Sequence, residues 1–128
     1  MTEQKHTKFP FEELKVWQRA VDFANAVIQL LENIDTERRH FILIEQLEAA
    51  ATSIALNIAE GKGRYSRKEF IQFLYIGRGS LYETVTLLTI FRRNQWIKAE
   101  EFEKIMNFAD EIGKMLASLI ASIRRSMD

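Results

Sequence analysis

The chain has 128 residues, 47% of them hydrophobic, and its 18 basic and 18 acidic residues give a formal net charge of zero at pH 7. One domain with its own core is expected at this length, and a neutral chain lacks the global positive field of a typical nucleic-acid-binding protein. Because cysteine is absent, disulfides and thiolate metal sites are excluded. We expect a cytoplasmic protein with no membrane partner, since no stretch approaches the roughly 18 uninterrupted apolar residues of a membrane span.

The N-terminal residues 1–10 are polar, include the only proline, Pro10, and show no periodicity, which predicts a loose lead-in. We expect residues 11–128 to form a single domain. From about residue 11 to residue 33, apolar residues recur at three- and four-residue steps, as in a helix of a bundle. The expected seam of this helix is Leu14, Trp17, Val21, Ala24, Ile28 and Leu31.

This first helix has more apolar residues than one seam requires. Val16, Phe23 and Leu30 widen its apolar arc to roughly 200° at about 100° per residue. A second buried contact is therefore expected, and another subunit is its simplest source. These three residues are candidates for a subunit interface, and a densely packed monomer is the alternative.

After a polar break, a second helix is predicted from about residue 41 to residue 60. Alanines make this helix thin, so that a neighbouring helix can approach closely, and we expect it to be the most central of the set. Gly61 predicts that the helix ends there in a left-handed residue. The expected seam is Ile44, Leu47, Ala51, Ile54 and Ile58.

A capping box of Ser66 and Glu69 predicts the start of a third helix, which runs from Arg67 to about Asn94. Gly77 and Gly79 lie in its middle. Since each costs about 1 kcal/mol relative to alanine in a helix, close packing of backbones is the expected compensation. We expect Gly77 to face a helix and Gly79 to face another subunit.

A fourth helix is predicted from about residue 99 to residue 125, where apolar residues keep the same spacing. Short connections place consecutive helices side by side. The sequence therefore predicts an all-α protein with an antiparallel up-down-up-down four-helix bundle.

Side chains suited to catalysis are sparse. Glu37 and His40 have the Glu-x-x-His spacing of di-iron bundles, but such sites need two of these motifs at mid-helix, and this single motif lies in a predicted connection. No serine has a histidine near it in sequence to act as an activating base. We expect no enzyme, and no catalytic, cofactor or metal site.

Cations cluster around the predicted turn between the second and third helices. Antiparallel topology would bring the end of the fourth helix to the same place, next to a helix N-terminus, which suits phosphate groups. The alternative is a solvated charge run that Glu60 and Glu69 partly neutralise. The candidate phosphate or RNA contacts are Lys62, Arg64, Arg67, Lys68, Arg124 and Arg125.

Asn57, Glu60 and Glu83 are polar residues beside apolar seams. Burial of such groups requires hydrogen-bond partners. We predict a structural polar network that includes them. Its expected partners are Arg64, Arg67 and Arg78.

Several segments of the chain resemble one family. They are FEELKVWQRA near the N-terminus, SIALNIAEGKGRYSRKEFIQFL in the centre, GSLYE in the third helix and DEIGKML in the fourth. They are similar to the bacterial four-helix bundle proteins named for open reading frames within intervening sequences of 23S ribosomal RNA genes. The resemblance covers about residues 9–123, and Asn57–Gly61 is its most specific part.

That resemblance implies an up-down bundle that assembles into a homopentamer. It also implies kinship with the accessory protein of diversity-generating retroelements, a basic pentamer that binds a reverse transcriptase and RNA. We therefore expect a non-enzymatic, homo-oligomeric binding or scaffolding module for RNA or a ribonucleoprotein partner. A protein-only adaptor without nucleic-acid binding is the alternative.

Overall fold

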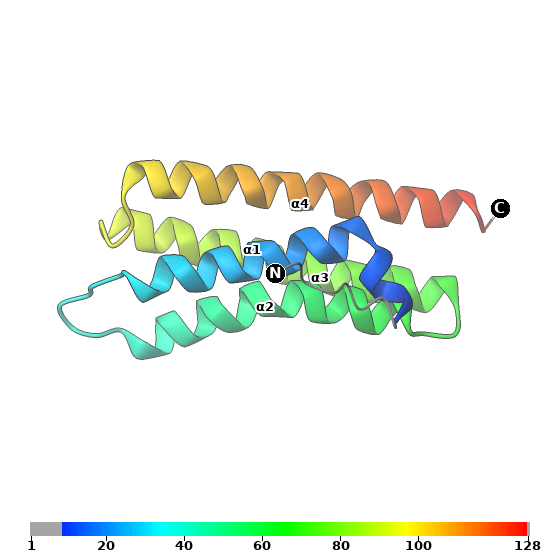
Figure 1. The fold of residues 1–128 in the computed structure, drawn as a ribbon, viewed down its shortest axis with the longest axis horizontal. Coiled ribbons are helices and arrows are strands. Elements are labelled where there is room, and N and C mark those ends of the chain that lie inside the picture. Colours follow the sequence, from blue (N-terminus) through cyan, green and yellow to red (C-terminus); the bar gives the residue numbers. More distant parts are fainter. Residues whose placement is uncertain (1–8, 128) are drawn as a thin grey trace, which may run out of the picture.

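Helices make up almost all of residues 9–127, the part of the chain that the computed structural model describes (Figure 1). Figure 1 shows consecutive helices running in opposite directions and joined at alternate ends of the molecule. No strand occurs in this described part. The predicted all-α bundle is thus confirmed. The elements are the 3-10 turn η1 (Pro10–Glu13) and the helices α1 (Lys15–Glu32), α2 (Phe41–Lys62), α3 (Arg67–Arg93) and α4 (Ala99–Arg125).

The predicted lead-in falls mainly on residues 1–8, which lie outside the described residues. The turn η1 begins at Pro10, one residue before the predicted start of the domain. The Phe11 ring packs edge-on against the ring of Trp17, with centroids 5.1 Å apart, which holds η1 against α1.

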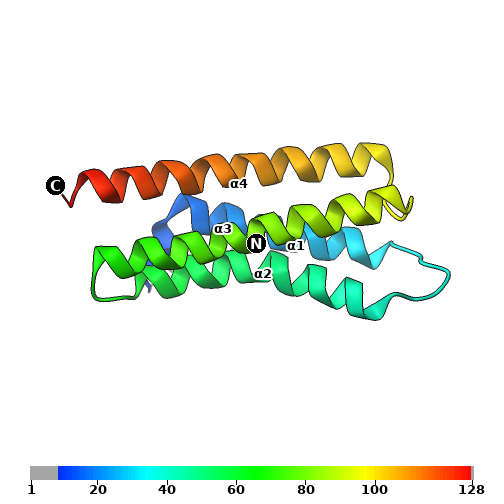
Figure 2. The ribbon, with the colours of Figure 1, turned by 180° about the vertical axis from the view of Figure 1, so that it is seen from behind.

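The helices contact one another in the order α1, α2, α3, α4 and back to α1, as the view from behind also indicates (Figure 2). The tightest pair is α2 with α3, and α2 has the most extensive packing, as predicted for a thin helix. Among the described helices, α2 alone has the length and apolar composition of a membrane span, but core helices of bundles share these properties, and α2 packs between α1 and α3.

The buried face of α1 differs from the predicted seam. Val16 and Phe23 are buried inside the subunit, and the Phe23 ring packs edge-on against Phe108 of α4. Their prediction as subunit-interface residues is wrong, because α4 covers this side of α1. Leu30 is half-buried and Gly79 is exposed, so that for these two the interface stays a prediction.

The pair α1 and α4 is joined at the surface by one ion pair. Arg19 donates to Glu111 at 2.8 Å, and its guanidinium lies 4.2 Å from the centroid of the Phe108 ring. The hydrogen bond from Arg19 lowers the pKa of the Glu111 carboxyl below its ordinary value. Both side chains are partly exposed, so this contact orients α4 more than it stabilises the fold.

Gly61 does not end α2, contrary to the prediction, because the helix continues to Lys62 and Gly61 has no positive φ. Instead Gly61 is buried against α3. A Cβ atom added to it would lie 2.6 Å from the Cβ of Phe73 and 3.3 Å from the Phe70 carbonyl oxygen. The absence of a side chain here therefore sets how closely α2 and α3 approach.

Replacement of Gly61 by alanine tests this role. We expect Gly61→Ala to destabilise the fold by up to about 2 kcal/mol, because an overpacking cost of about 1–3 kcal/mol is offset by a gain of only about 1 kcal/mol in helix propensity. The change would appear as a lower midpoint of urea unfolding.

Gly79 provides the matched control, since nothing lies within 4 Å of a Cβ added there. Gly79→Ala should stabilise α3 by about 0.5–1 kcal/mol. Both variants are compared at one protein concentration, because self-association would shift the midpoint. Equal stability of Gly61→Ala and the unsubstituted chain would show that α2 and α3 have room to move apart.

Candidate functional site

The basic end of the molecule is formed by the turn between α2 and α3 together with the last turn of α4 (Figure 1). A hydrogen bond joins the two parts, because Nη1 of Arg67 donates to the carbonyl oxygen of Ser126 at 2.9 Å. The structure thus brings together all the predicted cations, and each of them is exposed. They are Lys62, Arg64, Arg67, Lys68, Arg124 and Arg125.

Two carboxylates on the same segments are already engaged. Glu60 accepts a hydrogen bond from Arg64 at 2.8 Å in an exposed ion pair. Glu69 lies in the predicted capping box, where the Glu69 backbone N–H donates to the Ser66 hydroxyl at 3.1 Å and that hydroxyl donates to the Glu69 carboxylate. Among the described residues of these two segments, six cations lie with two carboxylates, which is an excess of positive charge on a neutral chain.

Aromatic rings support two of these cations. The guanidinium of Arg64 lies 4.6 Å from the centroid of the Phe73 ring, and the ammonium of Lys62 lies 5.8 Å from that of Phe70. These contacts hold the aliphatic parts of both side chains against α3 while the charges face solvent.

Tyr65 lies at the tip of the turn and is fully exposed. We did not predict a role for it. The signal was present in the sequence, because an aromatic residue between Arg64 and Ser66 in a polar turn has no helical seam to join. A fully exposed ring among cations is a surface on which a planar group can stack.

The predicted polar network does not form as one unit. Asn57 faces α3 and donates to the carbonyl oxygen and the hydroxyl of Ser53 at 2.8 and 2.9 Å, and Ser80 donates to the same hydroxyl. The hydrogen-bond partner of Asn57 is therefore Ser53 and not one of the expected arginines. Glu60 pairs with Arg64 at the surface, and Glu83 is exposed.

An apolar groove of about 520 Å³ runs between α1 and α2 on the outside of the bundle. Leu56 is 66% exposed and Val21 is 39% exposed along it. The surplus apolar surface of α1 thus exists, but it comprises Trp17, Val21 and Ile28. The predicted seam is wrong for these three residues, whereas its members Ala24 and Leu31 are buried as predicted.

The Glu-x-x-His motif lies outside the bundle interior. Glu37 is exposed in the connection between α1 and α2, and the His40 ring packs 4.5 Å from the Trp96 ring. Within residues 9–127, no group of three or more His, Cys, Asp or Glu side chains lies close enough to hold a metal ion.

These features define the class of protein: a small antiparallel helical bundle with one cationic end and one apolar outer groove. Residues 12–118 match the family described as 23S rRNA-intervening sequence protein, and the chain belongs to that family. The resemblance predicted from the sequence is confirmed.

A solved structure with the same fold comes from Bacteroides thetaiotaomicron VPI-5482 and is described as a protein with unknown function from the S23 ribosomal protein family. It is 32% identical to this chain with a TM-score of 0.76, and the match covers 82% of this chain and 97% of the other. A comparison with curated proteins gives no match.

Proposed function

We propose that this protein is a non-enzymatic, homo-oligomeric binding module that holds RNA, or the RNA of a ribonucleoprotein partner, at its basic end. The observation that carries the proposal is the convergence of the exposed cations of two distant segments, tied together by the bond between Arg67 and Ser126. The resemblance to the retroelement accessory protein, which binds RNA, also favours an RNA partner.

Phosphate groups fit this end for two physical reasons. The first turn of α3 presents backbone N–H groups at the positive end of its helix dipole, next to Arg67 and Lys68. Each phosphate that a cation neutralises releases condensed counterions, which favours binding at low salt. Because the chain as a whole is neutral, binding should be confined to this end.

The RNA proposal is tested by measuring the affinity for a structured RNA over a range of salt concentrations. Affinity should fall steeply as salt rises, and the triple variant Arg67→Ala, Lys68→Ala, Arg125→Ala should bind more weakly at low salt. The slope of log affinity against log salt should also become shallower by about 1 for each lost phosphate contact.

The control replaces Arg38 and Arg39 by alanine, since these exposed arginines lie in the connection at the other end of the bundle. They should leave both the affinity and the slope unchanged. An equal loss in the control would mean diffuse charge attraction. If the unsubstituted protein fails to bind even at low salt, the protein-only scaffold becomes the better account.

Self-association is the second part of the proposal, and a second copy is the proposed occupant of the groove between α1 and α2. Exposed Leu56 lies on α2, and Ile42 is also exposed near the start of that helix. Exposed apolar side chains beside an apolar groove indicate a protein-protein contact. The family resemblance favours a pentamer.

The change Val21→Asp tests the groove, because it places a charge in the proposed contact without entering the core. We expect light scattering at micromolar concentration to give several times the 15.0 kDa mass of one chain, and the variant to give a smaller mass. Helicity measured by circular dichroism should stay the same.

Ile90→Asp is the matched control, because Ile90 on α3 and Val21 are both 39% exposed. It should keep the assembly intact. A monomer mass for the unsubstituted protein would remove the oligomer from the proposal. If Ile90→Asp dissociates the assembly and Val21→Asp does not, the interface lies on α3 and not in the groove between α1 and α2.

A further inference from the structure

Tyrosine and arginine side chains alternate along the outside of α3 where it meets α4. The guanidinium of Arg78 lies 4.7 Å from the centroid of the Tyr75 ring and 5.7 Å from that of the Tyr82 ring. Arg124 of α4 is a second cation at Tyr75, and its guanidinium lies 5.3 Å from the centroid of that ring. The four residues Tyr82, Arg78, Tyr75 and Arg124 therefore form a continuous series, which we call the tyrosine-arginine track.

The track leads from the middle of α3 to the basic end. Tyr75, Arg78 and Tyr82 are spaced by three and four residues, which places them on one face of the helix over about 10 Å. Arg124 is in the last turn of α4, whose C-terminus is bonded to Arg67. The track is thus an extension of the cationic surface, and of its four residues only Arg124 was among the predicted contacts.

A groove of about 440 Å³ lies beside the track between α3 and α4, with Arg78 and Tyr82 at its edge. Its only lining acid, Asp110, is paired with Lys114 at 2.9 Å, and that lysine is itself exposed. The groove wall opposite Tyr82 therefore carries no uncompensated negative charge from this pair.

Core packing does not account for the exposed tyrosine rings. Of the three tyrosines in the chain, Tyr65 and Tyr82 are exposed, whereas Tyr75 is half-buried and packs against the core. Tyr82 is 59% exposed. Exposed cation-π contacts stabilise a fold by only about 0.5–1 kcal/mol each. The track therefore contributes little to folding stability, although it exposes apolar ring surface to solvent.

We infer that the tyrosine-arginine track binds single-stranded RNA, with an unpaired base stacked on the exposed Tyr82 ring and phosphates held by the arginines. This inference rests on the proposed RNA-binding function and names the kind of RNA. Aromatic rings between cations suit single strands, whose bases have free faces. Double-stranded RNA keeps its bases stacked inside the helix and is recognised by shape and backbone contacts instead.

The test compares an unstructured, dye-labelled uridine oligonucleotide with a duplex RNA of the same length by fluorescence anisotropy. Tyr82→Ala should weaken binding of the single strand by roughly 5- to 100-fold, in line with the loss of one stacked base, and leave the salt slope unchanged. Tyr82→Phe should bind like the unsubstituted protein, because the ring is kept. Arg78→Ala should make the salt slope shallower by about 1.

Phe41→Ala is the matched control, since Phe41 is 63% exposed at the opposite end of the bundle, and it should change nothing. Three results would each overturn the inference. Tyr82→Ala could leave single-strand binding unchanged, Tyr82→Phe could lose as much affinity as Tyr82→Ala, or the protein could bind the duplex more tightly than the single strand. In those cases the proposed function stands if the triple variant of the basic end still weakens binding. Absence of any RNA binding would overturn both.

Discussion

Close approach of α2 and α3 is the constraint on which the rest of the structure depends. It is possible because Gly61 leaves no atom where a Cβ would meet Phe73, whereas a Cβ added to Gly77 would make only ordinary contacts with Asn57 and Ile54. The same proximity aligns Asn57 with Ser53 and Ser80 in hydrogen bonds that satisfy polar groups between the two helices. A short turn therefore suffices to join α2 and α3, and the cations of this turn lie together at the basic end.

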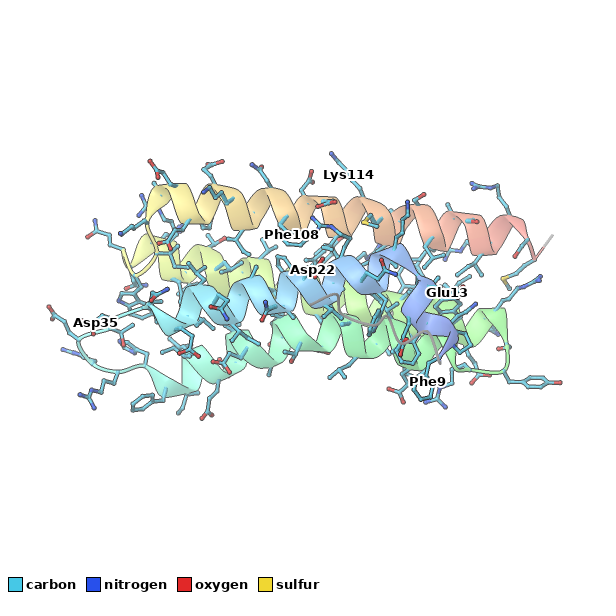
Figure 3. All side chains as sticks on the ribbon, in the orientation of Figure 1. Phe9, Glu13, Asp22, Asp35, Phe108 and Lys114 are labelled. Atoms are coloured by element: carbon cyan, nitrogen blue, oxygen red, sulfur yellow. The ribbon has the colours of Figure 1, made fainter. Side chains whose placement is uncertain are left out.

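The outer helices pack less closely than this central pair, and the difference leaves a groove on each side of it. Both grooves are lined mainly by apolar side chains, but the one between α3 and α4 also borders Tyr82 and Arg78. Figure 3 shows Asp22 on α1, and Phe108 and Lys114 on α4. Burial of apolar surface favours a protein partner, and exposed rings with cations favour a nucleic acid. The two proposed activities therefore use separate surfaces and need not compete.

The helices and their order could be predicted because apolar spacing and caps are local signals. Which face of α1 is turned toward the core could not be predicted. Val16 and Phe23 belong to one apolar stripe of α1, and Trp17 and Val21 belong to a neighbouring stripe. Both stripes satisfy helical periodicity. The choice depends on Phe108 of α4, which is far away in sequence and packs on Phe23. The prediction for Gly61 is wrong for a similar reason. A glycine near the end of a helical segment can either end the helix or allow close packing, and only the neighbouring helix decides between the two.

The basic end was predictable because antiparallel topology brings cations of known sequence position together, whereas the track needed a contact between helices. Tyr75, Arg78 and Tyr82 have a regular spacing, but Arg124 joins them only through the packing of α4 on α3. One subunit offers few phosphate contacts, which by themselves give weak, salt-sensitive binding. In the proposed homo-oligomer each copy would repeat the track, and linked sites raise the effective concentration for one RNA strand. Assembly through the apolar groove would then convert several weak contacts into useful affinity while the chain keeps its neutral charge.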